Sequence, residues 1–445
     1  MLTTLAAPAF AATWRIEDGD ITVKAGETEG TNKVSQGTNK DVVDTDTIIT
    51  NSDKDTASSH TVTIDAGNDK VEVTLKDVNI KADSGSALTS KGDVTLTLKG
   101  DNHLTGGNGD IYGGSGISSS GSLTISGGET DSLTAQGGSG GDGIYSSSGV
   151  AISGGTVTAN GGDGGNVSGG GIISGNGGVT ISGGTVKAAG GDSKDGYGGD
   201  GIRSGGGVTI SGNTVNAAGG NGGKVGGYGI CSFDRVAISG GAVTANGGDG
   251  GKVGGSGIYS SDIDLSGSLE LTAKAGSPNG KALSRAGYEL DLDAIKDKLG
   301  PGAKVTATDA DGKVNQVSIP GPVEPEKPVI PEESSSSSDG GSATPSAPAS
   351  PLPGLTVTDK SGQRISYTST QSGNTLTVCV GRFTASLRAS LSALRQLRAE
   401  GIETITFQTV LCSTTLSVDE LLAMGGEDAE AVLTHRLTDS SLTVG

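Results

Sequence analysis

The sequence is poor in the side chains that carry most enzyme and metal chemistry. Its 445 residues include three histidines, three cysteines, one tryptophan and only 3% aromatic residues. The histidines, at His60, His103 and His435, do not have a spacing typical of metal ligands, and the cysteines do not either. Polysaccharide lyases and hydrolases need clustered carboxylates, whereas the acidic residues of the glycine-rich middle are mostly single. These scarcities argue against an enzyme.

Basic residues and long apolar runs are also scarce. Lys and Arg number 31 against 50 Asp and Glu, which gives a net charge of −19. Residues 1–319 carry most of the excess, with 36 acidic and 23 basic side chains. An acidic surface repels phosphates, so the charge argues against nucleic acid and anionic membranes as partners. No stretch is long and apolar enough to predict membrane insertion.

What the sequence has in excess is glycine, at 81 residues, and the excess is periodic. The segments VAISGGTVTANGG, VTISGGTVKAAGG, VTISGNTVNAAGG and VAISGGAVTANGG follow a shorter copy, LTISGG. Their shared isoleucines recur every 27 to 29 residues, at Ile125, Ile152, Ile181, Ile210 and Ile238. A Gly-Ile pair recurs in step, at Ile117, Ile144, Ile172, Ile202, Ile230 and Ile258. A fixed period of this length predicts a solenoid, in which each unit packs only against its neighbours.

Within one unit, Val150 and Ile152 alternate with Ala151 and Ser153, which is the period of a β-strand. Each unit offers three short strands with glycine at the corners, and stacked units would pair equivalent strands about 4.8 Å apart. We therefore predict an all-β fold, a right-handed parallel β-helix of roughly nine coils between residues 60 and 285. Leucine-rich, helical and collagen repeats do not fit this pattern, because Leu and helix formers are scarce and glycine lacks a three-residue period.

The repeats also divide into inward and outward positions. The isoleucine column, together with Val157, Val186, Val215 and Val243, is expected to form core ladders, and Ala159, Ala188, Ala217 and Ala245 to mark where the interior narrows. The glycine-rich loops, such as GGDGGNVSGG, are expected to be the mobile part of each coil, because glycine loses most entropy on ordering.

Composition divides the chain into five segments. Residues 1–12, MLTTLAAPAFAA, predict the remnant of a secretory signal sequence, with an ordinary N-terminal strand as the alternative. Residues 13–59 form the N-terminal cap and first strands, and 60–319 the β-helix with a C-terminal hairpin cap. Residues 320–353 hold nine of the twelve prolines and predict a linker. Residues 354–445 predict a small α+β domain with helices over 383–401 and 418–425.

The three cysteines define the structure less closely than the repeats do. Cys379 and Cys412 lie in or beside predicted strands of the tail domain and would form a disulfide or remain as two thiols. Cys231 is expected to be an unpaired thiol at an outward position of the rod.

Two aspartates are the candidate calcium ligands. The segment GGSGGDGIY fits a nonapeptide calcium motif with Asp142 as the ligand, and DGYGGDGIR, with Asp200, fits except at its first position. The equivalent positions in other coils are Ser115, Gly170, Tyr228 and Ser256, and the motif does not repeat every nine residues. A purely structural turn therefore remains the alternative.

One outward column follows the Gly-Ile marker and is the candidate ligand-binding surface. It consists of Tyr145, Ile173, Arg203, Cys231 and Tyr259. Stacked tyrosines with an arginine can hold sugar rings by stacking and hydrogen bonding, which makes Tyr145, Arg203 and Tyr259 the predicted ligand-binding residues. An ordinary mixed surface is the alternative.

The stretch from SSHTVTIDAG through VEVTLKDVNIKADSGSALTSKGDVTLTLKGDNHLTGG into the ISGGTVTANGG repeats resembles the secreted carbohydrate-binding parallel β-helix proteins of clostridia and related gut bacteria. The resemblance covers about residues 13–285. It implies a non-catalytic, calcium-assisted binder of cell-wall polysaccharide, pectic or cellulosic, exported to the cell surface. A structural or adhesive surface rod and a polysaccharide lyase remain the alternatives.

Overall fold

The computed structural model describes residues 11–109 and 112–321, and residues 355–444 apart from short gaps at 360–362, 366, 373, 381, 383, 410–412, 425–428 and 437–438. The chain divides into two compact units, residues 1–327 and 328–445. The predicted signal remnant and linker lie almost wholly outside the described residues.

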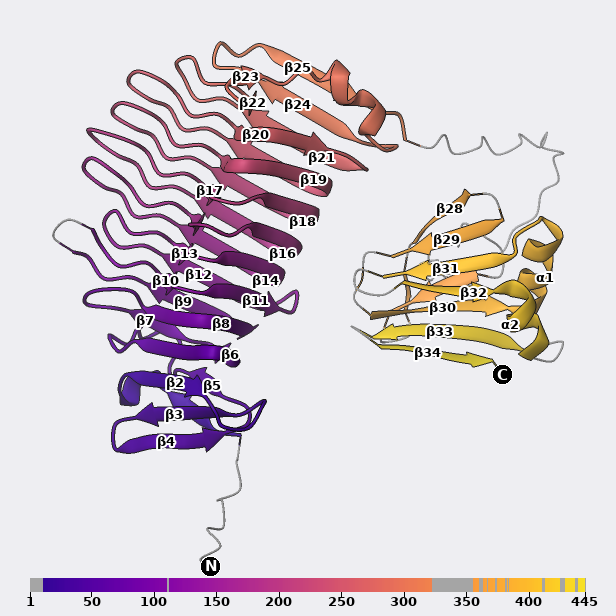
Figure 1. Ribbon diagram of the computed structural model, residues 1–445, viewed down its shortest axis with the longest axis horizontal. Helices are drawn as coiled ribbons and strands as arrows, with labels where there is room; N and C mark the ends of the chain where they lie inside the picture. Colours follow the sequence, from indigo (N-terminus) through magenta and orange to yellow (C-terminus); the bar gives the residue numbers. More distant parts are fainter. Residues whose placement is uncertain are drawn as a thin grey trace, which may run out of the picture. The chain divides into compact units, whose positions relative to one another are not determined.

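The first unit winds as a parallel β-helix (Figure 1). Its leading strands are β1 (Thr13–Arg15), β2 (Ile21–Ala25), β3 (Asn32–Gln36), β4 (Asn39–Asp44), β5 (Ile48–Thr50), β6 (Val62–Lys76), β7 (Asn79–Lys81), β8 (Leu88–Lys99) and β9 (Asp101–Thr105). The glycine-rich coils hold β10 (Ile117–Ser119), β11 (Ser122–Gly127), β12 (Ser132–Gln136), β13 (Ile144–Ser146), β14 (Gly149–Asn160), β15 (Ile172–Ser174), β16 (Val179–Ala189), β17 (Ile202–Ser204), β18 (Val208–Ala218), β19 (Ile230–Asn246), β20 (Ile258–Leu265) and β21 (Leu269–Lys274).

The predicted core ladders are confirmed by the strand register. Ile125, Ile152, Ile181, Ile210 and Ile238 pair in turn from coil to coil, and each is fully buried. The valine and alanine columns pair in the same way. The second and third predicted strands of a coil join into one bent strand, as in β14, where Gly155 takes a φ of 76° at the bend.

The β-helix is longer than the sequence predicts, with about 11 coils rather than nine. The additional coils begin within residues 13–59, where β2 pairs parallel with β6, and β5 pairs parallel with both β1 and β6. These segments lack the glycine repeat, so the repeat period could not show that they belong to the β-helix. The hairpin of β3 and β4 lies between β2 and β5 in the chain, and β3 pairs antiparallel with β2. Trp14 Nε1 donates a 2.8 Å hydrogen bond to the buried Asp44 carboxylate at the end of β4.

The other end of the β-helix carries β22 (Leu283–Arg285), β23 (Tyr288–Glu289), β24 (Lys304–Thr308) and β25 (Val314–Ser318). The described part of this unit also holds two short 3-10 helices, η1 (Ile16–Asp18) and η2 (Asp293–Lys298). β24 continues the parallel stack on β21, and β25 pairs with it antiparallel as the predicted hairpin. Asp309 accepts hydrogen bonds from the backbone N–H groups of Asp311 and Lys313, so the hairpin loop is closed by an aspartate side chain.

The glycine-rich loops are hydrogen-bonded from coil to coil, in contrast to the mobility expected from their composition. They project from one side of the β-helix as a stack of long loops (Figure 1). Gly162 N donates to Gly141 O at 2.8 Å, Gly169 N to Gly162 O at 2.9 Å, and Gly191 N to Gly169 O at 2.9 Å. The pattern continues through Gly199, Gly220, Gly227, Gly248 and Gly255 to Gly276. We call these residues the glycine array.

The glycine array is packed too closely for any side chain. A Cβ atom added to Gly169 would lie 1.8 Å from Gly141 O, and one added to Gly227 would lie 1.8 Å from Gly199 O. The outgoing leg of each loop thus donates a hydrogen bond to the returning leg of the loop before it. The returning leg of the same loop donates to the outgoing leg, so the bonding runs without a break from loop to loop. Glycine is required here for close backbone approach, so the loss of chain entropy is offset by inter-coil hydrogen bonds.

One corner of the rod departs from its neighbours. Asn213 occupies the position that Gly155, Gly184 and Gly241 hold in other coils, with a φ of 91°, and its amide nitrogen is buried without a hydrogen-bond partner. A non-glycine residue in this conformation costs about 1–3 kcal/mol. We expect Asn213→Gly to raise the free energy of unfolding by about 1 kcal/mol in denaturant titrations. An unchanged or lower stability would contradict this assignment of strain.

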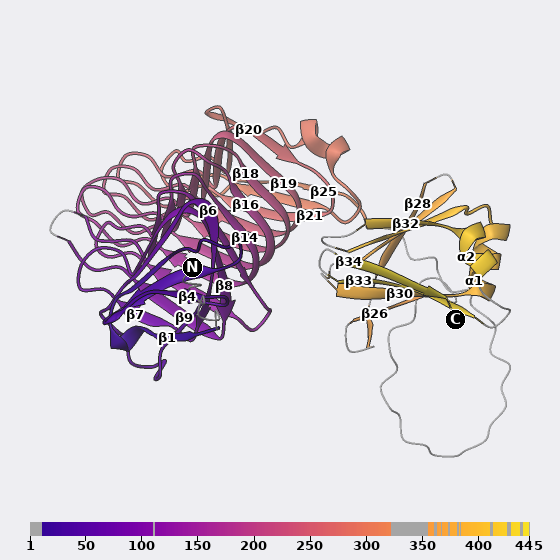
Figure 2. The same cartoon turned by 60° about the horizontal axis from the view of Figure 1, so that its bottom comes forward.

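The second unit is a small α+β domain. One sheet has the order β27 (Arg364–Ile365), β26 (Leu355–Thr358), β30 (Thr384–Ser390), β33 (Glu430–Arg436) and β34 (Asp439–Val444). The other has β28 (Thr368–Ser372), β29 (Thr375–Cys379), β31 (Thr404–Gln408) and β32 (Ser413–Ser417). Helices α1 (Leu391–Ala399) and α2 (Val418–Met424) pack against each other at one end of the sheets (Figure 2).

The prediction of a helix over 383–401 is wrong for its first half and correct for its second. Its first part is strand β30, in which Ala385, Leu387 and Ala389 are buried at alternate positions, and α1 begins only at Leu391. Ser390 caps this helix by accepting a hydrogen bond from the backbone N–H of Ala393. The pairing of Cys379 with Cys412 lies outside the described residues, because Cys412 is not among them.

A buried histidine joins the two sheets of the tail domain. His435 of β33 has Nδ1 3.2 Å from the Thr409 hydroxyl and Nε2 3.0 Å from that of Thr414, and its ring packs on Phe407. Burial lowers its pKa below 6.5. A lowered pKa stabilises the fold above pH 6.5, and this contribution is lost as the pH falls through the folded-state pKa. We expect NMR titration to show His435 protonating at lower pH than 6.5; a value at or above it would contradict this.

Candidate functional site

The predicted outward column is assembled by the sheet register. Tyr145 pairs with Ile173, Ile173 with Arg203, Arg203 with Cys231, and Cys231 with Tyr259. These residues belong to β13, β15, β17, β19 and β20, and neighbouring strands of such a sheet lie about 4.8 Å apart. We call this column, with the flanking residues Asp142, Asp200 and Tyr228, the aromatic strip.

The aromatic rings are concentrated at one end of the strip. Tyr228 and Tyr259 stack with their ring centroids 4.9 Å apart and their planes 19° from parallel. Both tyrosines are half-buried, as is Tyr145 further along. A stacked pair held by strand β20 and by the loop that leads into β19 is a fixed apolar surface with polar hydroxyl ends, which suits the flat face of a sugar ring.

Asp142 and Asp200 flank the strip from its glycine-loop side, and each carboxylate is bonded to the next coil. Asp142 Oδ1 accepts the backbone N–H of Gly170 at 2.7 Å, and Asp200 Oδ1 accepts that of Tyr228 at 2.7 Å. Burial raises the pKa of both carboxyl groups, that of Asp200 to about 6. The other oxygen of Asp200 lies 3.8 Å from Nη1 of Arg203.

Cys231 is the unpaired thiol at an outward position that the sequence predicts, and it is buried there. It lies on the outward column between Arg203 and Tyr259 but is only 1% exposed. Burial raises the pKa of its thiol to about 12, with the Asp200 charge adding to the shift. The thiol is therefore protonated at neutral pH, and its role in the strip is to pack.

Sequence reasoning missed two aromatic residues, Tyr228 within the strip and Phe233 beside it. Tyr228 was aligned with the turn positions of other coils, and its contact with Tyr259 depends on a loop path that the period does not specify. Phe233 is 61% exposed, and its carbonyl accepts a hydrogen bond from Ser261, two residues beyond Tyr259. The non-repeating segment CSFDR was the available signal for Phe233, because it replaces a Ser/Gly corner.

The single acidic residues of the glycine loops form a second ladder. Asp163 Oδ1 accepts the backbone N–H of Asp192 at 2.8 Å, and Asp192 Oδ1 accepts that of Asn221 at 2.6 Å. Asn221 and Asp249 repeat the arrangement in the following coils. In the described parts of the chain, no three His, Cys, Asp or Glu side chains gather closely enough to hold a metal ion.

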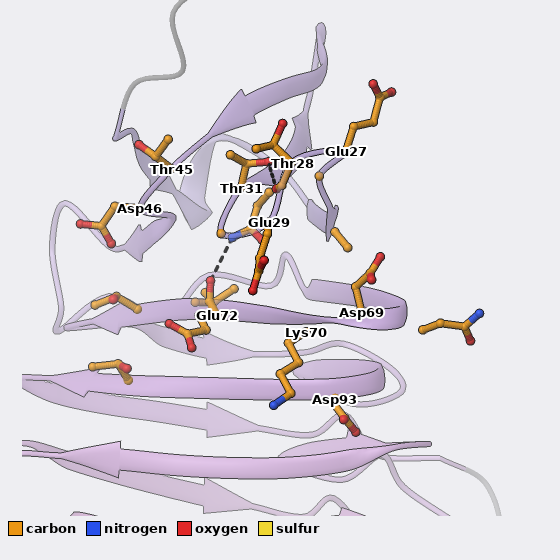
Figure 3. Close-up of a pocket in the computed structure, with 18 residues that line it drawn as sticks. Glu27, Thr28, Glu29, Thr31, Thr45, Asp46, Asp69, Lys70, Glu72 and Asp93 are labelled. Carbon is orange, nitrogen blue, oxygen red and sulfur yellow. Dashed lines mark hydrogen bonds between the residues drawn. The ribbon is translucent and has the colours of Figure 1, made fainter. Parts of the chain in front are cut away.

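A separate polar groove of about 650 Å³ lies near the N-terminal hairpin (Figure 3). The loop between β2 and β3 contributes Glu27 and Glu29, and strand β6 contributes Asp69, Lys70 and Glu72. One edge is fixed by the Asn32 amide, which donates to the Glu72 carbonyl at 2.9 Å. Sequence reasoning did not reveal this groove, because its lining comes from separate segments between residues 25 and 97 that only the fold brings together.

Comparison with family models, curated proteins and solved structures finds no match to this chain. The fold by itself defines the class of protein as a β-solenoid, and one face of it carries the aromatic strip. Among the residues that the structure describes, no helix is both long and apolar enough to cross a lipid bilayer.

Proposed function

We propose that this chain is a non-catalytic carbohydrate-binding β-helix, secreted or held at the cell surface, whose glycan ligand lies along the aromatic strip. The observation that carries the proposal is the stacked pair of Tyr228 and Tyr259, beside a column of paired strands that also presents Arg203, two strands from Tyr259. Aromatic faces and a nearby guanidinium are the groups that bind the apolar face and the hydroxyl groups of a pyranose. The resemblance described above supports cell-wall polysaccharide, pectic or cellulosic, as the ligand class.

The test is retention of the full chain on insoluble cellulose and in gels containing soluble pectin. Tyr259→Ala should weaken binding about tenfold, which is about 1.4 kcal/mol, because it removes one ring of the stack. Tyr288→Ala is the control, since Tyr288 is a 79% exposed tyrosine on β23 of the C-terminal cap, outside the strip. Equal binding by both variants would remove the strip from the proposal, and no retention on any polysaccharide would contradict the function.

Calcium assistance and the absence of catalysis are parts of the same proposal. Binding measured in calcium and in EDTA should differ if the ion bridges the acidic residues and the glycan, and should be equal if Asp142 and Asp200 serve only as turn carboxylates. Incubation with pectate should give no unsaturated uronate absorbance. Its appearance would favour the polysaccharide lyase alternative.

A stiff surface rod is the second candidate function. The glycine array favours it, because each loop is bonded to both neighbouring loops and so adds a second hydrogen-bonded layer beside the sheet. In this role the coils present loops or the tail domain to a partner. Adhesion to host cells that survives Tyr259→Ala would support the rod over the glycan-binding strip.

A further inference from the structure

The positive charge of the aromatic strip is offset by its own carboxylates. Arg203 Nη1 lies 3.8 Å from Asp200 Oδ2, and the Asp142 carboxylate is also within the electrostatic influence of the guanidinium. The Asp200 side chain is only 11% exposed, which places this ion pair in a partly desolvated setting where charges interact more strongly than in water. Two carboxylates therefore face one cation.

No other cation belongs to the strip. Its remaining members in the described structure are Tyr145, Ile173, Tyr228, Cys231 and Tyr259. The basic residues of the neighbouring corner are paired with acids: Arg235 lies 3.5 Å from Asp262 and 3.1 Å from Asp264, and Arg285 lies 3.1 Å from Asp262. The strip is thus negative at neutral pH, on a rod whose residues 1–319 carry 36 acidic against 23 basic side chains. Such a field repels polyanions.

The polar groups left on the strip suit hydroxyl groups. The Asp142 and Asp200 carboxylates each use Oδ1 for a backbone N–H. A carboxylate oxygen accepts strong hydrogen bonds from hydroxyl donors, and the tyrosine hydroxyls both donate and accept. A uronate carboxylate is a negatively charged acceptor. The cation of the strip, Arg203, is already paired with Asp200, so it is not available to such a carboxylate.

From these contacts we infer that the aromatic strip selects neutral hexose chains and rejects polyuronates. This inference rests on the proposed function and narrows its ligand class from pectic or cellulosic glycans to uncharged ones. Asp200 is the selecting residue, because its carboxylate offsets the charge of Arg203. The stacked Tyr228 and Tyr259 bind either sugar face, so charge decides between ligands of equal shape.

The test compares hexagalacturonate with its methyl ester, which has the same ring and no charge, and includes cellohexaose as a neutral glucan. Affinities of the full chain are measured by calorimetry at neutral pH, low salt and with EDTA. The methyl ester should bind at least tenfold more tightly than the acid. Asp200→Asn keeps an oxygen acceptor for the Tyr228 N–H and releases the Arg203 charge, so it should tighten binding of the acid and leave the neutral ligands unchanged.

Asp192→Asn is the matched control. It removes the same charge from an aspartate with the same kind of backbone hydrogen bond, but in the glycine loops and away from Arg203. It should leave the ratio of acid to ester affinities as in the parent chain. Equal or tighter binding of the acid form by the parent chain overturns the inference, as does an unchanged ratio in Asp200→Asn. Failure of all three ligands to bind, in calcium as well as in EDTA, overturns the proposed function itself.

Discussion

Gly199→Ala is expected to lower the free energy of unfolding by about 3–5 kcal/mol, because the added methyl group has no room in the glycine array. Its Cβ would lie 1.8 Å from Gly169 O and 3.0 Å from Gly191 N, both of them backbone atoms. Relief requires the neighbouring coils to separate, which breaks hydrogen bonds on both sides of the loop. Thermal unfolding followed by circular dichroism would measure the loss.

Gly165→Ala is the control from the same stack of loops. A Cβ at Gly165 meets nothing within 4 Å, so alanine should change the stability by less than about 1 kcal/mol. If Gly199→Ala proved as mild as Gly165→Ala, the loops would be loosely packed and the glycine array would not contribute to the stiffness of the rod.

Asp200→Asn is expected to stabilise the rod at neutral pH relative to acid pH. Burial raises the pKa of Asp200 from 3.8 to about 6. A raised folded-state pKa means that the carboxyl group's contribution to stability is full below pH 3.8 and is lost as the pH rises through about 6. The shift corresponds to about 3 kcal/mol, and the neutral asparagine avoids this loss.

Denaturant titrations of the two proteins at pH 3.5 and 7.5, conditions on either side of the transition, would measure this effect. The stability difference between Asp200→Asn and the parent chain should increase in favour of the variant as the pH rises. Asp192→Asn should show little change, because Asp192 is exposed to solvent. A difference independent of pH would mean that the Asp200 carboxylate is better solvated than its surroundings suggest.

The inward half of the fold could be predicted because it repeats. A core position in a β-helix tolerates only apolar side chains of matched size, so Ile152 and its equivalents carry the period in their identity. The register of Tyr145, Arg203 and Tyr259 followed from the same period. Tyr228 and Phe233 were missed because side chains at loops and corners have no such constraint, and their positions depend on the path of the backbone.

The glycine array was missed for a different reason. Composition alone indicates that glycine is costly to order, and it does not reveal that a bare backbone can approach two neighbouring loops closely enough to bond with both. Strand β30 was likewise obscured, because the alternation of Ala385, Leu387 and Ala389 runs directly into a helical segment. Both structures, the glycine array and strand β30, are determined by contacts with residues distant in sequence.

The coil-to-coil bonding of the glycine loops also limits how this protein can change in length. A single extra residue is accommodated within a loop and leaves the length of the rod unchanged: Gly191 and Gly199 are eight positions apart where Gly162 and Gly169 are seven apart, and both loops keep their bonds to their neighbours. Duplicating or removing a whole repeat keeps each donor opposite an acceptor and changes the rod by about 4.8 Å. Near-identical repeats recombine readily, so length variation among natural versions should occur in whole coils, at the level of the gene.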